Sequence, residues 1–248
     1  MDVVYILALR QLKRYLRARA RIIGSLGQPI LFLVALGFGF GRTFAKAGGG
    51  NYIQFLTPGI ISMGILFTAV FTGIEIIWDR QFGFLKETLV APVSRLQIVL
   101  GRTLGGAGVA MIQGMIVALV CFIAGFRFEN PALLPVALVF MFLISLLFTS
   151  VGTVVGSILE DLHAFPLIMN FLVMPLFFFS GALFPVQDLP KALRVAVGIN
   201  PLSYGVDGLR GAMSHGTLFG LGTDFIVLGI LTAILLSIGS YFFSRIQL

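Results

Sequence analysis

Apolar residues along the chain fall into runs of about 20, separated by shorter polar segments, and do not alternate with polar residues. A run of that length matches the ~30 Å hydrocarbon core of a bilayer at about 1.5 Å per helical residue. The pattern predicts an all-α polytopic membrane protein, with segment 1–21 followed by one transmembrane domain, 22–248. The six predicted transmembrane helices are 22–41, 56–78, 103–126, 132–159, 164–183 and 223–243.

Residues 1–21 form a predicted amphipathic helix that lies in the membrane interface. Its apolar positions share 4-3-4 spacing, as do its arginines on a different face, where cations meet anionic headgroups. The apolar set is Tyr5, Leu9, Leu12 and Leu16, and the basic set is Arg10, Arg14, Arg17 and Arg21. One interpretation is an interfacial helix that also flanks a cytoplasmic partner. The alternative is a plain positive-inside anchor.

The polar stretch 78–102, between the second and third spans, carries a helical pattern of its own. Phe82, Leu85 and Leu89 share one helical face, and Pro92 ends the short helix before Ser94 N-caps the next one. Its charges are Asp79, Arg80, Lys86 and Glu87. A rigid helix held between two membrane helices is suited to transmit motion from a cytosolic partner. A surface loop without a partner is the alternative.

Residues 184–222 are too long and too apolar for an ordinary loop. The Phe184-Pro185 and Asn200-Pro201 pairs interrupt the segment, leaving two short predicted helices over 189–197 and 201–213. Neither is long enough to span a bilayer. We expect two half-helices that re-enter from the outer face, where irregular backbone survives only if protein or a wet cavity surrounds it. A helix pair lying on the outer leaflet is the alternative.

Ionisable residues inside the spans are scarce, which argues against a proton or ion relay. Glu75 is expected to cap a helix or to pair with Arg80 or a basic residue of the first helix. Asp207 and Arg210 are three residues apart and are expected to pair on one helical face. Two G-x-x-x-G spacings allow close helix approach, Gly101 with Gly105 and Gly152 with Gly156.

Composition agrees with a membrane protein, since 58% of residues are hydrophobic and only 11% are charged. The net charge of +7 does not indicate nucleic-acid binding, because the basic residues cluster beside the spans. With six spans, 11 of the 17 lysines and arginines fall on the side of the termini, which predicts that both termini are cytoplasmic.

Several chemistries have no sequence signature. There is no G-x-x-x-x-G-K-[ST] phosphate loop, and His163 and His215 lie far from any cysteine or carboxylate cluster that would indicate a metal site. The single Cys121 lies in an apolar run, and no catalytic triad stands out. We therefore expect no cofactor on this chain, no metal and no enzymatic activity of its own.

Two stretches resemble the membrane subunits of ABC-2-type exporters, a group that includes daunorubicin-resistance-like drug exporters and O-antigen and teichoic acid exporters. Residues 79–95, DRQFGFLKETLVAPVSR, are similar to the family element E/D-R-x-x-G-x-L-x-x-L-L-x-x-P-x-S, with Thr88 where an aliphatic residue is more usual. Residues 180–190, SGALFPVQDLP, and 200–211, NPLSYGVDGLRG, resemble the late family pattern through Pro201, Leu202, Tyr204 and Arg210.

The resemblance implies a six-span subunit that pairs with a second one, as a homodimer or heterodimer, and with two cytosolic ATPase subunits that carry ATP and Mg²⁺. It implies a coupling helix within 79–102 that binds the ATPase, and an outer gate. Coupling residues would be Asp79, Arg80, Phe82, Gly83, Leu85, Lys86, Glu87, Leu89, Pro92, Ser94 and Arg95. Gate residues would be Pro185, Pro190, Asn200, Pro201, Tyr204, Asp207 and Arg210.

The expected function is export of a hydrophobic or amphipathic compound, a drug or lipid-like molecule, across a prokaryotic inner membrane. A lipid-linked glycan exporter of the same family is the first alternative. An ATP-independent channel or a membrane scaffold is the alternative from another class.

Overall fold

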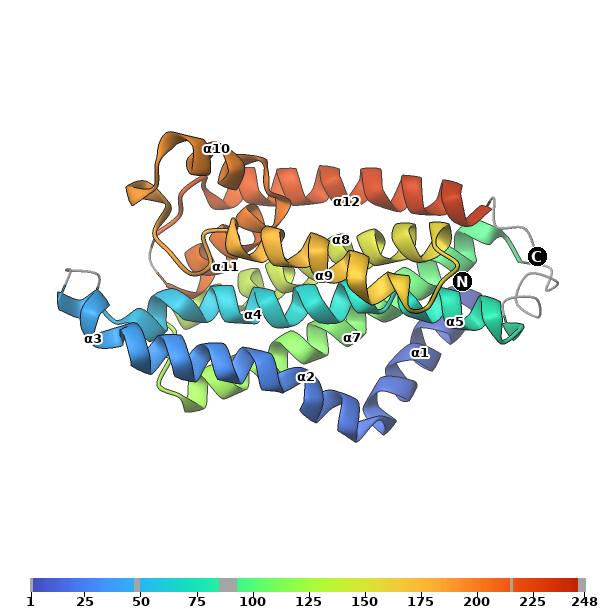
Figure 1. Ribbon diagram of the computed structural model, residues 1–248, viewed down its shortest axis with the longest axis horizontal. Helices are drawn as coiled ribbons and strands as arrows, with labels where there is room; N and C mark the ends of the chain where they lie inside the picture. The colour runs from blue at the N-terminus through green and yellow to red at the C-terminus, as the bar shows by residue number, and fades with distance from the viewer. Residues whose placement is uncertain (1, 47–49, 85–92, 215, 245–248) are drawn as a thin grey trace.

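The computed structural model describes residues 2–46, 50–84, 93–214 and 216–244, and these contain helices but no β-strand (Figure 1). The N-terminal part comprises α1 (Asp2–Arg17), α2 (Arg19–Phe32), the π-helical η1 (Leu33–Phe38) and α3 (Gly39–Lys46). The middle comprises α4 (Tyr52–Phe71), α5 (Ile74–Gln81), α7 (Arg95–Ile123), η2 (Pro131–Leu133) and α8 (Leu134–Ile158). The remainder is α9 (Ala164–Phe178), η3 (Val186–Asp188), α10 (Lys191–Ile199), α11 (Pro201–Met213) and α12 (Leu221–Ser244).

Five of the described helical segments are long and apolar enough to cross a membrane. They are Arg19–Lys46, Tyr52–Gln81, Arg95–Ile123, Pro131–Ile158 and Leu221–Phe243. They correspond to five of the six predicted spans, and the second and third each extend further into the polar stretch than predicted.

The predicted fifth span is shorter than expected. The segment 164–183 forms only the 15-residue α9, which ends at Phe178. At about 1.5 Å per residue such a helix is about 22 Å long, less than the ~30 Å of a hydrocarbon core. The chain then turns at Ser180 and Gly181, where Gly181 has φ +70°, a backbone conformation that favours glycine. A sixth crossing stays a prediction.

Side chains at the helix starts explain where several elements begin. Ser94 accepts a hydrogen bond from the Gln97 amide, and the Gln97 side chain accepts one from the Ser94 amide, forming the capping box of α7. The predicted N-cap at Ser94 is therefore confirmed. Asn51 caps α4 and Asn200 caps α11, each through its side-chain oxygen.

Helix α4 lies in the middle of the bundle, with α2 and α9 on either side of it in Figure 1. It also contacts α7, α8 and α11, and it supplies much of the buried apolar core. Where α4 passes into α5, its backbone approaches α8 closely. A Cβ at Gly73 would collide with the Gly152 backbone, and one at Gly156 with the Gly73 carbonyl. The predicted role of Gly152 and Gly156 in close helix approach is confirmed.

Helix α1 packs against α7 rather than standing apart from the bundle. The contact is made at the two glycines of the predicted spacing, Gly101 and Gly105, which face Val4, Leu7, Ala8 and Gln11 of α1. A Cβ added at Gly101 would lie 3.1 Å from Val4 Cα, and one added at Gly105 would lie 2.9 Å from Ala8 Cα. Of the predicted apolar face, Tyr5 and Leu16 lie away from this contact, at 67% and 55% exposed, whereas Leu12 packs beside Gly108. The place of that face in the membrane interface stays a prediction.

The predicted end of the first helix was wrong. The helix does not continue to residue 21, because Ala18 leaves the helical conformation at φ −87° and ψ 64°. Arg19 and Arg21 consequently belong to α2, so the first candidate span begins three residues earlier than predicted.

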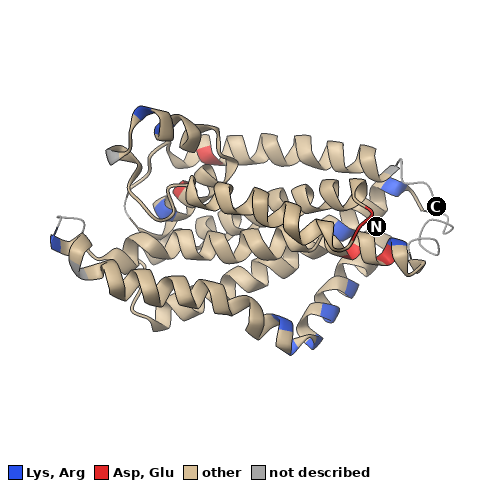
Figure 2. Cartoon of the chain, viewed as in Figure 1, with Lys and Arg blue, Asp and Glu red and all other residues tan. Residues whose placement is uncertain are grey.

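The bundle has two ends that differ in their elements and charges. At one end lie α1, α5 and the C-terminal end of α12, together with many of the basic residues, and we call this the basic end (Figure 2). At the other end lie α3, α10 and α11 (Figure 1). Helix α10 is largely exposed, whereas α11 is buried against α4, α8 and α12. Both short helices were predicted, and α11 has the predicted bounds 201–213.

Candidate functional site

The coupling stretch predicted from the sequence begins in α5 at the basic end. Of its residues, Asp79 and Arg80 lie in the last turn of α5, Phe82 and Gly83 follow it, and Ser94 and Arg95 begin α7. Phe82 is 67% exposed and stacks edge-on against Trp78 with ring centroids 6.1 Å apart. The other predicted coupling residues lie outside the described residues: Leu85, Lys86, Glu87, Leu89 and Pro92.

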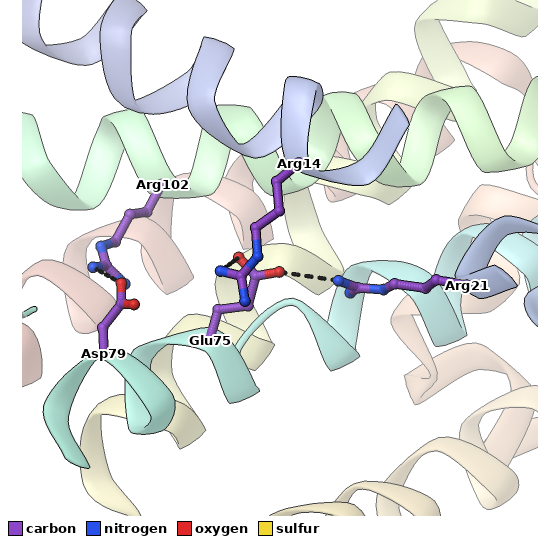
Figure 3. A network of polar contacts seen from close by, with 5 residues as sticks. All are labelled: Arg14, Arg21, Glu75, Asp79 and Arg102. Atoms are coloured by element: carbon purple, nitrogen blue, oxygen red, sulfur yellow. Dashed lines mark hydrogen bonds and ion pairs between the residues drawn. The ribbon is translucent and has the colours of Figure 1, made fainter. Parts of the chain in front are cut away.

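A buried ion pair joins α5 to the start of α7. The Arg102 guanidinium donates to the Asp79 carboxylate, and the two side chains are only 6% and 11% exposed (Figure 3). A buried charge is tolerated when its counter-charge lies directly beside it. The pair therefore fixes the last turn of α5 against α7, the helix that follows the predicted coupling segment.

A second contact joins α5 to the first two helices. Glu75 accepts a hydrogen bond from Arg21 at 3.0 Å, and its other oxygen lies 3.8 Å from Arg14 (Figure 3). The expectation that Glu75 pairs with a basic residue of the first segment is confirmed. Two arginines share one carboxylate, so this cluster has an excess positive charge.

A third contact reaches the turn between α8 and α9. Arg80 donates to the Glu160 carboxylate at 2.8 Å, and the Gln81 side-chain Nε2 donates to the Glu160 backbone carbonyl at 3.0 Å. The Glu160 side chain is 75% exposed, so the ion pair itself is weak, as surface pairs are. Helix α5 is thus tied by polar contacts to α1, α2, α7 and the α8–α9 turn.

The junction of α1 with α7 contains a buried polar contact. The Tyr15 hydroxyl donates to the Gln113 side-chain oxygen, and Tyr15 is 2% exposed. Burial raises the pKa of the Tyr15 hydroxyl, while Ser25 and the nearby Arg21 oppose that rise. This hydrogen bond therefore adds to the close packing of α1 against Gly101 and Gly105 of α7.

At the opposite end, the predicted gate residues form a hydrogen-bonded set around α11. Asn200 donates to the Leu176 carbonyl at 2.6 Å, and the Tyr204 hydroxyl donates to the Gly198 carbonyl at 2.7 Å. The remaining predicted prolines mark helix starts, with Pro185 before η3, Pro190 before α10 and Pro201 in the first turn of α11. These contacts join α9, α10 and α11.

The predicted pairing of Asp207 with Arg210 was wrong. The Asp207 carboxylate accepts from the backbone amides of Leu218 and Phe219 at 2.8 Å. Arg210 donates to the Gly181 carbonyl at 2.9 Å and lies over the Phe55 ring. Each side chain hydrogen-bonds the backbone of a loop and not the other side chain. Helix α11 therefore holds both the turn after α9 and the loop before α12.

Several polar residues at these sites were not singled out from the sequence. Arg102 ends the polar stretch just before the predicted third span, Gln113 interrupts that span, and Asp224 opens the last one. A lone polar residue inside or beside an apolar run was the available signal. Asp224 is fully buried, and neither carboxylate oxygen has a hydrogen-bond donor in the described part of the chain. Within the described ranges, no three His, Cys, Asp or Glu side chains are grouped to hold a metal ion.

Comparison with known proteins places the chain in a family. The model of the ABC-2 type transporter family matches residues 2–214. Nodulation protein J of Rhizobium leguminosarum bv. trifolii is 31% identical over 198 residues, which cover 79% of this chain and 75% of that protein. Nodulation protein J of Rhizobium meliloti (strain 1021) is 30% identical over 207 residues, covering 83% and 78%.

A third relative, ycf38 of Cyanophora paradoxa, bears the name of a transport permease and is 28% identical over 219 residues, covering 86% of this chain and 74% of that protein. The family match, the relatives and the long apolar helices agree on a multi-pass membrane protein that is not itself an enzyme. The chain belongs to the ABC-2 type transporter family, as a membrane transport subunit of the kind that works with an ATP-binding subunit.

Proposed function

We propose that this chain is the membrane-spanning subunit of an ATP-driven exporter in a prokaryotic inner membrane. Its cargo is a hydrophobic or amphipathic compound, such as a drug or a lipid-like molecule. Two copies of a cytosolic ATPase bind ATP and Mg²⁺ and contact the coupling segment 79–95. Both termini face the cytoplasm, and α9 contributes a sixth crossing beside α10 and α11, which re-enter from the outer face.

The observation that carries this proposal is the set of contacts around α5. The Asp79–Arg102 pair and the Glu75 and Arg80 contacts link this one short helix to α1, α2, α7 and the α8–α9 turn. A partner that displaces the chain just after α5 therefore acts on several spans at once. Coupling between distant sites requires such contiguous packed and polar contacts.

An apolar cavity supports the proposed class of cargo. It has a volume of about 490 Å³ and lies between the C-terminal half of the first span and the turn after α9. Aromatic side chains dominate its lining, among them Phe32, Phe40, Phe44, Phe178 and Phe184. Ligand sites for apolar compounds have this size and lining.

The exposed face of α9 supports a second copy of the subunit. Leu167 is 72% exposed and Phe171 is 84% exposed, on a helix too short to match the bilayer without help. A neighbouring subunit would cover this face and shield the turn at Gly181 from lipid. We propose a homodimer.

Co-purification tests the coupling role. The chain is expressed with the ATPase encoded beside it, and the two are expected to purify as one complex. Leu85→Asp or Glu87→Arg is expected to break the complex, whereas Arg19→Gln, an exposed change on α2, is expected to leave it intact. A complex that survives both coupling variants would contradict the proposal.

Labelling with a membrane-impermeant maleimide tests the orientation. In a Cys121→Ala background, Phe84→Cys at the basic end is expected to react only after the cytoplasmic side is opened. Ile199→Cys, 77% exposed on α10, is the matched control and is expected to react in intact cells. The reverse pattern would place the ATPase site outside the cell and exclude the proposed mechanism.

A further inference from the structure

A second cavity lies near the basic end, and none of the roles described above uses it. It has a volume of about 220 Å³ and is lined by the end of α1, residues 21–29 of α2 and the second half of α4. Drug-sized ligands occupy sites of roughly 300–1,000 Å³. This cavity is therefore suited to a headgroup and the first part of a chain, not to a whole large molecule.

The cavity has a polar edge on its α1 and α2 side. Tyr15, Arg21, Ser25 and Gln28 line this edge, together with Thr68 of α4. Arg21 donates one N–H group to Glu75, and a guanidinium carries five such N–H donors. Further donors thus remain available for an anionic or hydroxylated group.

The charge balance at this edge favours an anion. Glu75 is the acceptor for both Arg14 and Arg21, so one carboxylate meets two guanidinium groups and one positive charge is left over. Figure 3 shows both arginines directed toward Glu75 from α1 and α2. An arginine fork binds phosphate or carboxylate oxygens with good geometry.

The opposite wall of the cavity is apolar. Met63, Phe67 and Phe71 of α4 line it, and Pro29 of α2 adjoins them. Pro29 lies about two helical turns beyond Arg21 along α2, so this wall runs into the apolar part of the first span. A ligand lying along this wall would place its charged head at Arg21 and its hydrocarbon chain against the phenylalanines.

A glycine keeps the cavity open. A Cβ built on Gly24, which lines the cavity, meets no heavy atom within 4 Å. Gly27, three residues further along α2, also faces open space but does not line the cavity. The two positions therefore accept the same larger side chain, and only one of them fills the site.

We propose that this cavity binds the anionic headgroup of an amphiphile that enters from the bilayer leaflet at the basic end. The Arg21 guanidinium binds the charged oxygens, Ser25 and Gln28 contact neighbouring polar groups, and the Phe67 and Phe71 rings pack against the first part of the chain. The inference rests on the proposed function in one respect, namely that such an amphiphile is the class of compound that the protein exports. Binding itself requires neither the ATPase nor ATP.

Lipid binding to the full chain in nanodiscs tests the proposal. Native mass spectrometry compares phosphatidylglycerol with phosphatidylcholine of identical acyl chains, and glycerol phosphate serves as the headgroup without a chain. Phosphatidylglycerol is expected to be retained in preference to the other two. Arg21→Gln is expected to weaken its binding by roughly tenfold, the loss of one charge-assisted hydrogen bond. Gly24→Leu is expected to abolish the preference.

Two matched variants separate the cavity from general surface effects. Arg19→Gln removes an exposed charge of the same helix, and Gly27→Leu adds the same bulk outside the cavity, and both are expected to bind like the unmodified chain. The inference would be overturned if the two lipids bound equally, or if glycerol phosphate bound as well as phosphatidylglycerol. It would also be overturned if Arg19→Gln weakened phosphatidylglycerol binding as much as Arg21→Gln. Failure of ATP-driven export with lipid selectivity intact would count against the proposed function alone.

Discussion

Replacing Asp79 by asparagine is expected to destabilise the protein strongly, because it leaves a buried arginine without its counter-charge. The Arg102 side chain is 6% exposed, and its Nε already lacks a hydrogen-bond partner among the residues that the structure describes. Glu75 lines the same small cavity as Asp79 and Arg102, but it is held by Arg14 and Arg21. Breaking one side of such a buried pair costs about 3–5 kcal/mol.

The exposed Arg80–Glu160 pair provides the internal comparison. Its glutamate side chain is 75% exposed, so Arg80→Gln is expected to cost less than about 1 kcal/mol. At about 2–4 °C per kcal/mol for a chain of this size, Asp79→Asn is expected to lower the melting temperature by roughly 6–20 °C. Thermal unfolding of the purified chain, followed by helical circular dichroism, measures both variants.

A third variant separates the unpaired charge from any other effect of the substitution. Asp79→Leu combined with Arg102→Met replaces the ion pair by two apolar side chains, which is often neutral for stability. The double variant is therefore expected to melt well above Asp79→Asn. Equal melting of Asp79→Asn, Arg80→Gln and the unmodified chain would refute the reasoning, since it would mean that Arg102 finds another partner or water.

Three further predictions concern packing. Gly105→Leu is expected to displace α1, because even a Cβ at this position would meet Ala8 Cα at 2.9 Å, and protease cleavage after α1 should become faster than in the unmodified chain. Gly152→Val is expected to destabilise by at least about 1–3 kcal/mol, measured by thermal unfolding, since the Val70 backbone occupies the space; unchanged melting would contradict the backbone contact. Cys121 is fully buried, so maleimide is expected to label it only after denaturation in SDS, and rapid labelling of the native chain would show that α7 is accessible.

The sequence by itself determined the class of the protein and where many helices begin. Hydrocarbon thickness sets a minimum length for an apolar run, so the long spans follow from the residue pattern alone. Caps are equally local, and Ser94 begins α7 while Asn200 and Pro201 begin α11 as expected. The transport role and the separate ATPase came from the resemblance of residues 79–95 and 200–211 to ABC-2-type exporters, with which the missing phosphate loop agrees.

Only the tertiary structure decided which charged residues meet. The partners of Glu75, Arg80 and Asp79 lie 54, 80 and 23 residues away in sequence, and helical periodicity says nothing about such distances. For the same reason, Asp207 and Arg210 hydrogen-bond the backbones of two different loops and do not pair with each other. Helix periodicity fixes which residues share a face, but the packing of glycines such as Gly105 against α1 decides which face is buried.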